Sequence, residues 1–104
     1  FEDIHDSNVH DAGLIYDIGI GGVSIIIERE LKHGTALRLE LDLEDGMGPF
    51  VAMGSVVWQD KFGTGKGQLM EGWNRTGIIF TDMDKDKIQR IFRFLYNHVN
   101  KSKV

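Results

Sequence analysis

Cysteine is absent from this chain of 104 residues, and proline occurs only once. The lack of cysteine excludes disulfides, thiolate nucleophiles and cysteine-bound zinc, and it fits a reducing compartment. No apolar run approaches the roughly 20 residues that a membrane-spanning helix needs, and no signal peptide opens the sequence. We therefore expect a cytoplasmic protein that does not insert into a membrane.

An excess of positive charge is missing as well. Sixteen acidic and twelve basic residues give a formal net charge of −4, so DNA and anionic membranes are not expected partners. With a hydrophobic content of 41%, residues 1–104 fit one domain around a single core. An anionic ligand would have to be held by cations gathered locally.

Alternation of apolar and polar residues predicts strands along most of the chain. The clearest example is residues 37–43, where leucine stands at every second position. In the next strand the same alternation places Trp58 on the face of Ala52 and Val56, and Gly54 indicates a bulge or bend. The predicted strands are residues 14–18, 23–27, 35–45, 50–60 and 75–83.

The remaining segments have other patterns. Residues 1–13 are predicted to form a short strand or an irregular lead-in, and residues 60–75 a long loop. After Asp84 the period changes to 3.6 residues, which predicts an amphipathic helix capped by Asp82 or Asp84. Its expected core-facing stripe is Ile88, Ile91, Phe92, Leu95 and Val99. Strands followed by one helix indicate a mainly β fold, a small antiparallel barrel with a C-terminal α-helix.

Several short motifs are similar to ligand sites, but their spacing does not fit. A dinucleotide fingerprint starting at Gly19 would require glycine five residues later, where serine stands, and a phosphate loop would require Ser or Thr after Lys66. The acidic stretch from Asp82 lacks the glycine and glutamate of a calcium loop. His5 and His10, with aspartates nearby, define no metal geometry. We expect no metal site.

Catalytic motifs are missing too. The sequence has no cysteine nucleophile, no G-x-S-x-G elbow and no carboxylate pair whose spacing predicts a shared cleft. We therefore expect no catalytic residues, no cofactor and no enzyme activity. A binding or regulatory module is the better interpretation.

Three glycines and one aspartate interrupt an otherwise apolar stretch, LIYDIGIGGVSI at residues 14–25. Asp17 precedes Gly19, Gly21 and Gly22, and this combination is typical of a turn between two strands. A phosphate or nucleotide platform is the alternative, because a ligand can also approach the backbone closely at glycine. The residues alone favour the turn and leave the platform open.

The order of these elements, together with three motifs, resembles the PilZ domain family. The motifs are the stretch from Asp17 to Gly22 followed by VSI, GSVVW at residues 54–58, and TGIIF at residues 76–80. PilZ domains are bacterial six-stranded antiparallel β-barrels, and many bind the second messenger cyclic di-GMP without being enzymes. The resemblance therefore implies a six-stranded barrel and a role in second-messenger signalling.

The resemblance also implies roles for individual residues. Asp17 would accept hydrogen bonds from a guanine edge, Gly22 would let the strand lie against the ligand, and Trp58 would lie beside the nucleotide. Gly19 stands where the family has serine, so a hydroxyl is missing there. The arginines of the family's R-x-x-x-R motif stack on guanines and pair with phosphates. By the family's spacing, that motif would fall before Phe1.

The missing arginines determine the expected affinity. Two contacts worth about 1.5–3 kcal/mol each amount to about a hundred- to ten-thousand-fold in affinity. We therefore expect this chain to bind cyclic di-GMP weakly or not at all without an upstream R-x-x-x-R segment.

Three hypotheses follow. The first is a cyclic di-GMP-responsive regulatory domain, and we favour it. The second is a degenerate PilZ domain that binds no nucleotide and contacts an unidentified protein through residues such as Met70 and Trp73. The third is an unrelated barrel whose glycines only form a turn, in which case Asp17 would not face an accessible groove.

Overall fold

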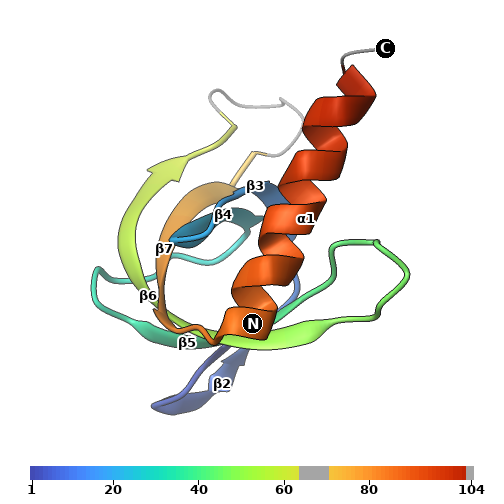
Figure 1. Ribbon diagram of the computed structural model, residues 1–104. Helices are drawn as coiled ribbons and strands as arrows, with labels where there is room; N and C mark the ends of the chain where they lie inside the picture. The colour runs from blue at the N-terminus through green and yellow to red at the C-terminus, as the bar shows by residue number, and fades with distance from the viewer. Residues whose placement is uncertain (64–70, 103–104) are drawn as a thin grey trace.

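The computed structural model describes residues 1–63 and 71–102 and contains seven strands followed by one helix (Figure 1). The predicted strands between residues 14 and 83 are present, with boundaries shifted by a few residues. The elements are β1 (Glu2–Asp3), β2 (Asp6–His10), β3 (Leu14–Ile18), β4 (Gly22–Ile27), β5 (Ala36–Leu41), β6 (Phe50–Lys61), β7 (Asn74–Asp82) and α1 (Lys85–Ser102).

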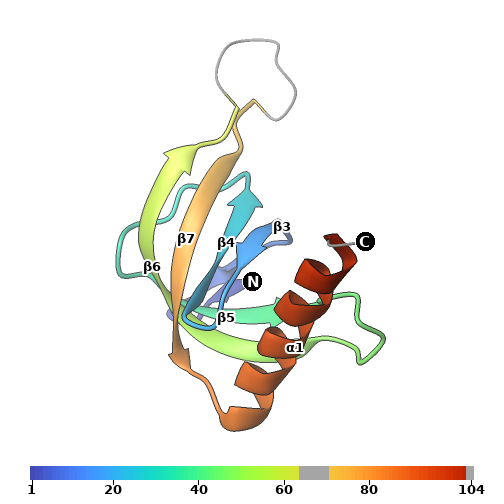
Figure 2. The ribbon, with the colours of Figure 1, turned by 45° about the horizontal axis from the view of Figure 1, so that its top comes forward.

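The strands form one antiparallel sheet in the order β2-β1-β5-β6-β7-β4-β3. Within the described residues, β2 and β3 each pair with a single neighbour, so the sheet is not closed. The predicted six-stranded barrel is therefore wrong in strand number and in closure. The additional pairing comes from residues 1–13, where β1 and β2 pair with each other and β1 pairs with β5. Figure 2 shows how strongly the open sheet bends.

The core lies on the concave side of this bend and follows the predicted alternation. In β5 every second residue is buried, and the leucines of that strand are at most 4% exposed. The same side of β4, β6 and β7 contributes branched apolar side chains and one alanine. The buried core cluster is Val23, Ile25, Ile27, Leu37, Leu39, Leu41, Ala52, Val56 and Ile78.

The pairing of β6 with β7 has two irregularities, and the second changes which side chains of β6 point outward. Its pairing with β7 shifts register between Met53 and Gly54, which confirms the bulge predicted at Gly54. A second shift lies between Val56 and Trp58. Val56 is 1% exposed and Trp58 is 40% exposed, so the prediction that the two share a face is wrong. The extra residue of the second bulge turns Trp58 to the outer face of the sheet.

The glycine stretch is the turn of the β3–β4 hairpin, as predicted. The Gly19 N–H donates a hydrogen bond to the Gly22 carbonyl at 2.8 Å, which leaves Ile20 and Gly21 at the tip. None of these glycines has a positive φ, so unusual backbone angles are not the reason for them. At Gly22 a side chain would collide with the Ile78 carbonyl oxygen of β7. Close packing of two strands therefore requires that glycine.

Helix α1 begins after Asp84, whose carboxylate accepts a hydrogen bond from the Lys87 N–H at 2.9 Å. This contact confirms the predicted N-cap. Ile91 is fully buried, as predicted, whereas Phe92 is 59% exposed, so the predicted stripe is too wide. Neighbouring helical residues point about 100° apart, so the helix face that buries Ile91 against the domain leaves Phe92 exposed to solvent. Val99 lies outside the described side chains.

One arginine of α1 attaches the helix to the β5–β6 connection. Arg90 donates hydrogen bonds to both carboxylate oxygens of Asp45, at 2.9 and 3.0 Å, and a third to the Gly48 carbonyl. The hydrogen bond from Arg90 lowers the pKa of Asp45 from 3.8 to about 2. In the part of the chain that the structure describes, no helix has the length and apolar character to cross a membrane.

Candidate functional site

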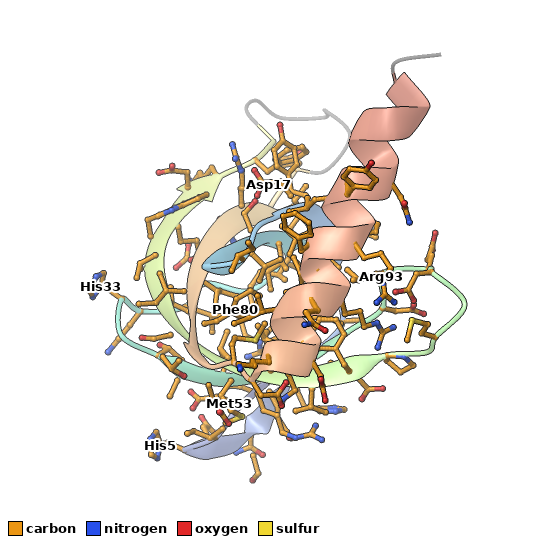
Figure 3. All side chains as sticks on the ribbon, in the orientation of Figure 1. His5, Asp17, His33, Met53, Phe80 and Arg93 are labelled. Atoms are coloured by element: carbon orange, nitrogen blue, oxygen red, sulfur yellow. The ribbon has the colours of Figure 1, made fainter. Side chains whose placement is uncertain are left out.

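Four residues from four strands form a row across the outer face of the sheet. Asp17 of β3 pairs with Ser24 of β4, Ser24 pairs with Gly77 of β7, and Gly77 pairs with Trp58 of β6. Ser24 alternates with the core residues of β4, which places this row on the face opposite the core. Figure 3 shows Asp17 in the upper part of the sheet, away from His5 at the lower end of the view. The row therefore brings two of the predicted site residues, Asp17 and Trp58, to one surface.

Asp17 is accessible and is hydrogen-bonded on one side. Its side chain is 65% exposed, and its Oδ1 accepts a hydrogen bond from the Ser24 hydroxyl at 2.5 Å. Ser24 itself is only 4% exposed. A hydroxyl is therefore present at the carboxylate, although the motif position Gly19 supplies none. The exposure of Asp17 disfavours the hypothesis in which this residue does not face an accessible surface.

Trp58 lies flat on the sheet because Gly77 has no side chain. A Cβ atom on Gly77 would collide with the Trp58 indole, so the ring rests directly on the backbone of β7. The bulge before Trp58 gives it the outward direction, and Gly77 gives it the space. One ring face is consequently covered by the sheet, while the side chain remains partly open to solvent.

Arg75 is held between two aromatic rings beside this row. Its guanidinium carbon lies 4.1 Å from the centroid of the Tyr16 ring and 5.3 Å from that of the Trp58 ring. Tyr16 in turn makes an edge contact with Phe62 at 5.8 Å. Each cation–π contact is worth about 0.5–2 kcal/mol. The rings therefore hold the charge of Arg75 at a defined place on the outer face.

Arg75 forms only a loose pair with Asp17. Its Nη2 lies 3.6 Å from Asp17 Oδ2, a distance beyond hydrogen bonding but within electrostatic attraction. Among the described residues, the buried Nε–H of Arg75 has no hydrogen-bond partner. The site thus combines a carboxylate, a hydroxyl, a cation and stacked rings, a set that can recognise a heterocyclic base with an attached anion.

The other two predicted site residues lie in the adjoining turn. Gly19 has open space where a side chain would be, and Gly22 packs against β7. A ligand contact at either position stays a prediction. Sequence reasoning missed Ser24, although a two-residue hairpin turn after Gly19 places position 24 opposite Asp17. The outer-face residues Tyr16, Arg75 and Gly77 gave no comparable signal.

Other candidate positions are less suited to a ligand. A hollow of about 430 Å³ is lined by Asp11, Ala12, Glu28, Arg29 and Trp73. Its arginine is already paired with a carboxylate, since Arg29 Nε lies 2.6 Å from Asp11 Oδ2. No group of three potential metal ligands occurs among the described residues. Lys66 and Met70 lie outside the described residues.

Comparison with known proteins identifies one family. The family model described as PilZ domain matches residues 3–97, which is most of the chain. No curated protein matches, and no solved structure does. The family match agrees with the resemblance carried by Asp17 to Gly22, GSVVW and TGIIF.

Proposed function

The chain belongs to the PilZ domain family, and we propose that it is a non-catalytic regulatory domain that binds cyclic di-GMP on the outer face of β3, β4, β7 and β6. One observation carries this proposal. Asp17, supported by the Ser24 hydroxyl, and the partly exposed Trp58 lie in a single row on that face. A base held at the carboxylate would lie over the sheet beside the indole.

The chemistry of the row suits guanine. The Watson–Crick edge of guanine presents adjacent N–H donors, and an ionised carboxylate offers only acceptors. Asp17 Oδ1 already accepts a hydrogen bond from the Ser24 hydroxyl, while Oδ2 lies 3.6 Å from Arg75 Nη2, which is beyond hydrogen bonding. Stacking of a base on an aromatic side chain adds about 1–3 kcal/mol. Asp17 would therefore select the base, and Trp58 would add affinity.

The expected affinity of this chain is low. The sequence contains no R-x-x-x-R motif, and two missing arginine contacts weaken a micromolar site to a dissociation constant of about 0.1–10 mM. Regulation would follow from the position of the site, because a ligand that spans four strands ties the edge strand β3 to the middle of the sheet. The altered surface would then be read by a partner protein.

Ligand-observed NMR tests the proposal, because it measures weak binding. Cyclic di-GMP is titrated into the chain, into Asp17→Ala and into Asp82→Ala, an exposed aspartate on β7 that serves as the control. Binding by the parent chain and the control, with loss in Asp17→Ala, supports the proposal. Equal binding by all three proteins refutes it. So does the absence of binding at ligand concentrations up to about 10 mM, the upper end of the expected range of dissociation constants.

A second function, protein binding without a nucleotide, is favoured by one observation. Strand β3 is an edge of the sheet, and its Leu14 and Tyr16 side chains are 58% and 50% exposed. Edge strands normally carry charged residues or bulges that limit further pairing, and β3 has one of each, Asp17 and the register shift between Ile15 and Asp17. An added strand from a partner would bind here by backbone hydrogen bonds. This function gains support if the NMR titration detects no nucleotide.

A further inference from the structure

We infer that Arg75 contacts a phosphodiester of the bound dinucleotide and that Tyr16 holds it in position for this contact. The inference rests on the proposed function, since it requires a nucleotide at Asp17 and Trp58. Neither Arg75 nor Tyr16 belongs to the motif from Asp17 to Gly22. The inferred role comes from the position of the guanidinium and from the hydrogen-bonding capacity that it has left.

The position places a positive charge between the two groups that would hold a base. Arg75 Nη2 is 3.6 Å from the Asp17 carboxylate, and the guanidinium carbon is 5.3 Å from the centre of the Trp58 ring. A guanine held by both residues would lie next to Arg75, so the guanidinium could reach the attached sugar phosphate. The Tyr16 ring, 4.1 Å from the guanidinium carbon, restricts movement of the cation on the other side.

Among the described residues, Arg75 keeps most of its hydrogen-bonding capacity free. A guanidinium has five N–H donors, and the buried Nε–H of Arg75 has no partner among the described residues. Arg29 and Arg90 differ, because each has a carboxylate oxygen within 2.9 Å. Arginine binds phosphate in a planar, two-pronged geometry. Arg75 can therefore direct its terminal N–H groups at an anion without breaking a hydrogen bond to the part of the chain that the structure describes.

A purely local role for Arg75 makes the opposite prediction. If the guanidinium only neutralised Asp17, or occupied the carboxylate in place of guanine, its removal would leave cyclic di-GMP binding unchanged or tighter. If it contacts phosphate, its removal weakens binding of the phosphodiester and leaves binding of the bare nucleoside unchanged. The sign of the change and its dependence on phosphate separate the two roles.

The experiment compares Arg75→Gln with Arg38→Gln, using cyclic di-GMP and guanosine as probes. Arg38 is a matched control, because its Nη1 lies 3.5 Å from a Glu2 carboxylate oxygen and its side chain is similarly exposed, at 43% against 36% for Arg75. Relative affinities are obtained from the initial slopes of NMR signal change against ligand concentration. Loss of one charge-assisted contact in Arg75→Gln should weaken cyclic di-GMP binding by about ten- to a hundredfold. Guanosine binding should stay within about twofold.

Further variants keep the inference testable if Arg75→Gln does not fold. Arg75→Lys retains the charge but loses the planar fork, so it should weaken cyclic di-GMP binding less than glutamine does. Tyr16→Leu should weaken it as well, whereas Tyr16→Phe should not, because the ring is retained. Binding of cyclic di-GMP to Arg75→Gln at least as tight as to the parent refutes the inference and leaves the proposed function intact. No binding by the parent chain refutes both.

Discussion

Replacement of Gly22 by alanine should destabilise the protein, whereas the same change at Gly19 should not. A Cβ atom at position 22 would collide with the Ile78 carbonyl oxygen, and it would lie 3.3 Å from both the Ile78 carbonyl carbon and the Ile79 Cα. All three are backbone atoms of β7, so no rotamer change relieves the contact. At Gly19 and Gly21 no atom lies within 4 Å of the added Cβ, and neither φ is positive.

The magnitude follows from these contacts. Overpacking at a site that cannot relax costs about 1–3 kcal/mol, and in a domain of this size each kcal/mol lowers Tm by about 4–8 °C. Gly22→Ala should therefore lower Tm by about 4–24 °C. Gly19→Ala should leave stability unchanged or raise it by about 0.4–1 kcal/mol, because alanine restricts the unfolded chain more than glycine does.

Urea unfolding followed by tryptophan fluorescence measures both variants, with Gly21→Ala as a second control. An unchanged m-value with a lower midpoint for Gly22→Ala would assign the effect to the folded state. Equal midpoints for Gly22→Ala and Gly19→Ala would refute the reasoning. In that case close approach of β4 and β7 would not be the reason for glycine at position 22.

Three further predictions concern the site and the helix. Gly19→Ser supplies the hydroxyl that the family carries at this position, where a side chain has open space. It should tighten cyclic di-GMP binding about 2- to 12-fold in an NMR titration. Weaker binding would contradict this prediction. The pKa of Asp45 is about 2 because of Arg90, so their pair stabilises the fold fully above pH 4 and loses this effect as the pH falls toward 2. Urea unfolding between pH 7 and pH 2 should show the loss of this contribution to the free energy of unfolding in the parent and not in Asp45→Asn. Parallel plots of the free energy of unfolding against pH for the two proteins would contradict the prediction. Asp84→Ala removes the N-cap of α1 and should lower the free energy of unfolding by about 0.5–2 kcal/mol. Asp86→Ala, two residues further along the chain, should have a smaller effect. Equal urea midpoints for the two variants would contradict the role of Asp84 as the cap.

Much of the fold could be predicted because one face of each strand is buried. The alternating leucines of β5 predict which residues of this strand lie in the core, because side chains two residues apart point to the same face of a strand. The sheet's closure could not be predicted, because it depends on how residues 1–13 pair with β5. Those residues are mostly exposed and show no alternation, so the sequence pattern carries little signal there.

The site divides in the same way. Asp17 and its hairpin could be predicted, because local turn chemistry determines them, and the hairpin in turn determines the partner Ser24. The face of Trp58 could not, since a bulge one residue earlier reverses the alternation. Arg75 is close to Asp17 only through the pairing of β3, β4 and β7, which joins residues far apart in the sequence. Local patterns do not report such contacts.

The most direct test of a nucleotide site on this face is protein-observed NMR of the chain during addition of cyclic di-GMP. The proposed site predicts that the amide signals of Asp17 and Ser24 and the indole N–H signal of Trp58 shift together, while the signals of the β1–β2 hairpin stay in place. Shifts confined to the β1–β2 hairpin or to α1, with these three signals unmoved, would contradict a cyclic di-GMP site on the outer face.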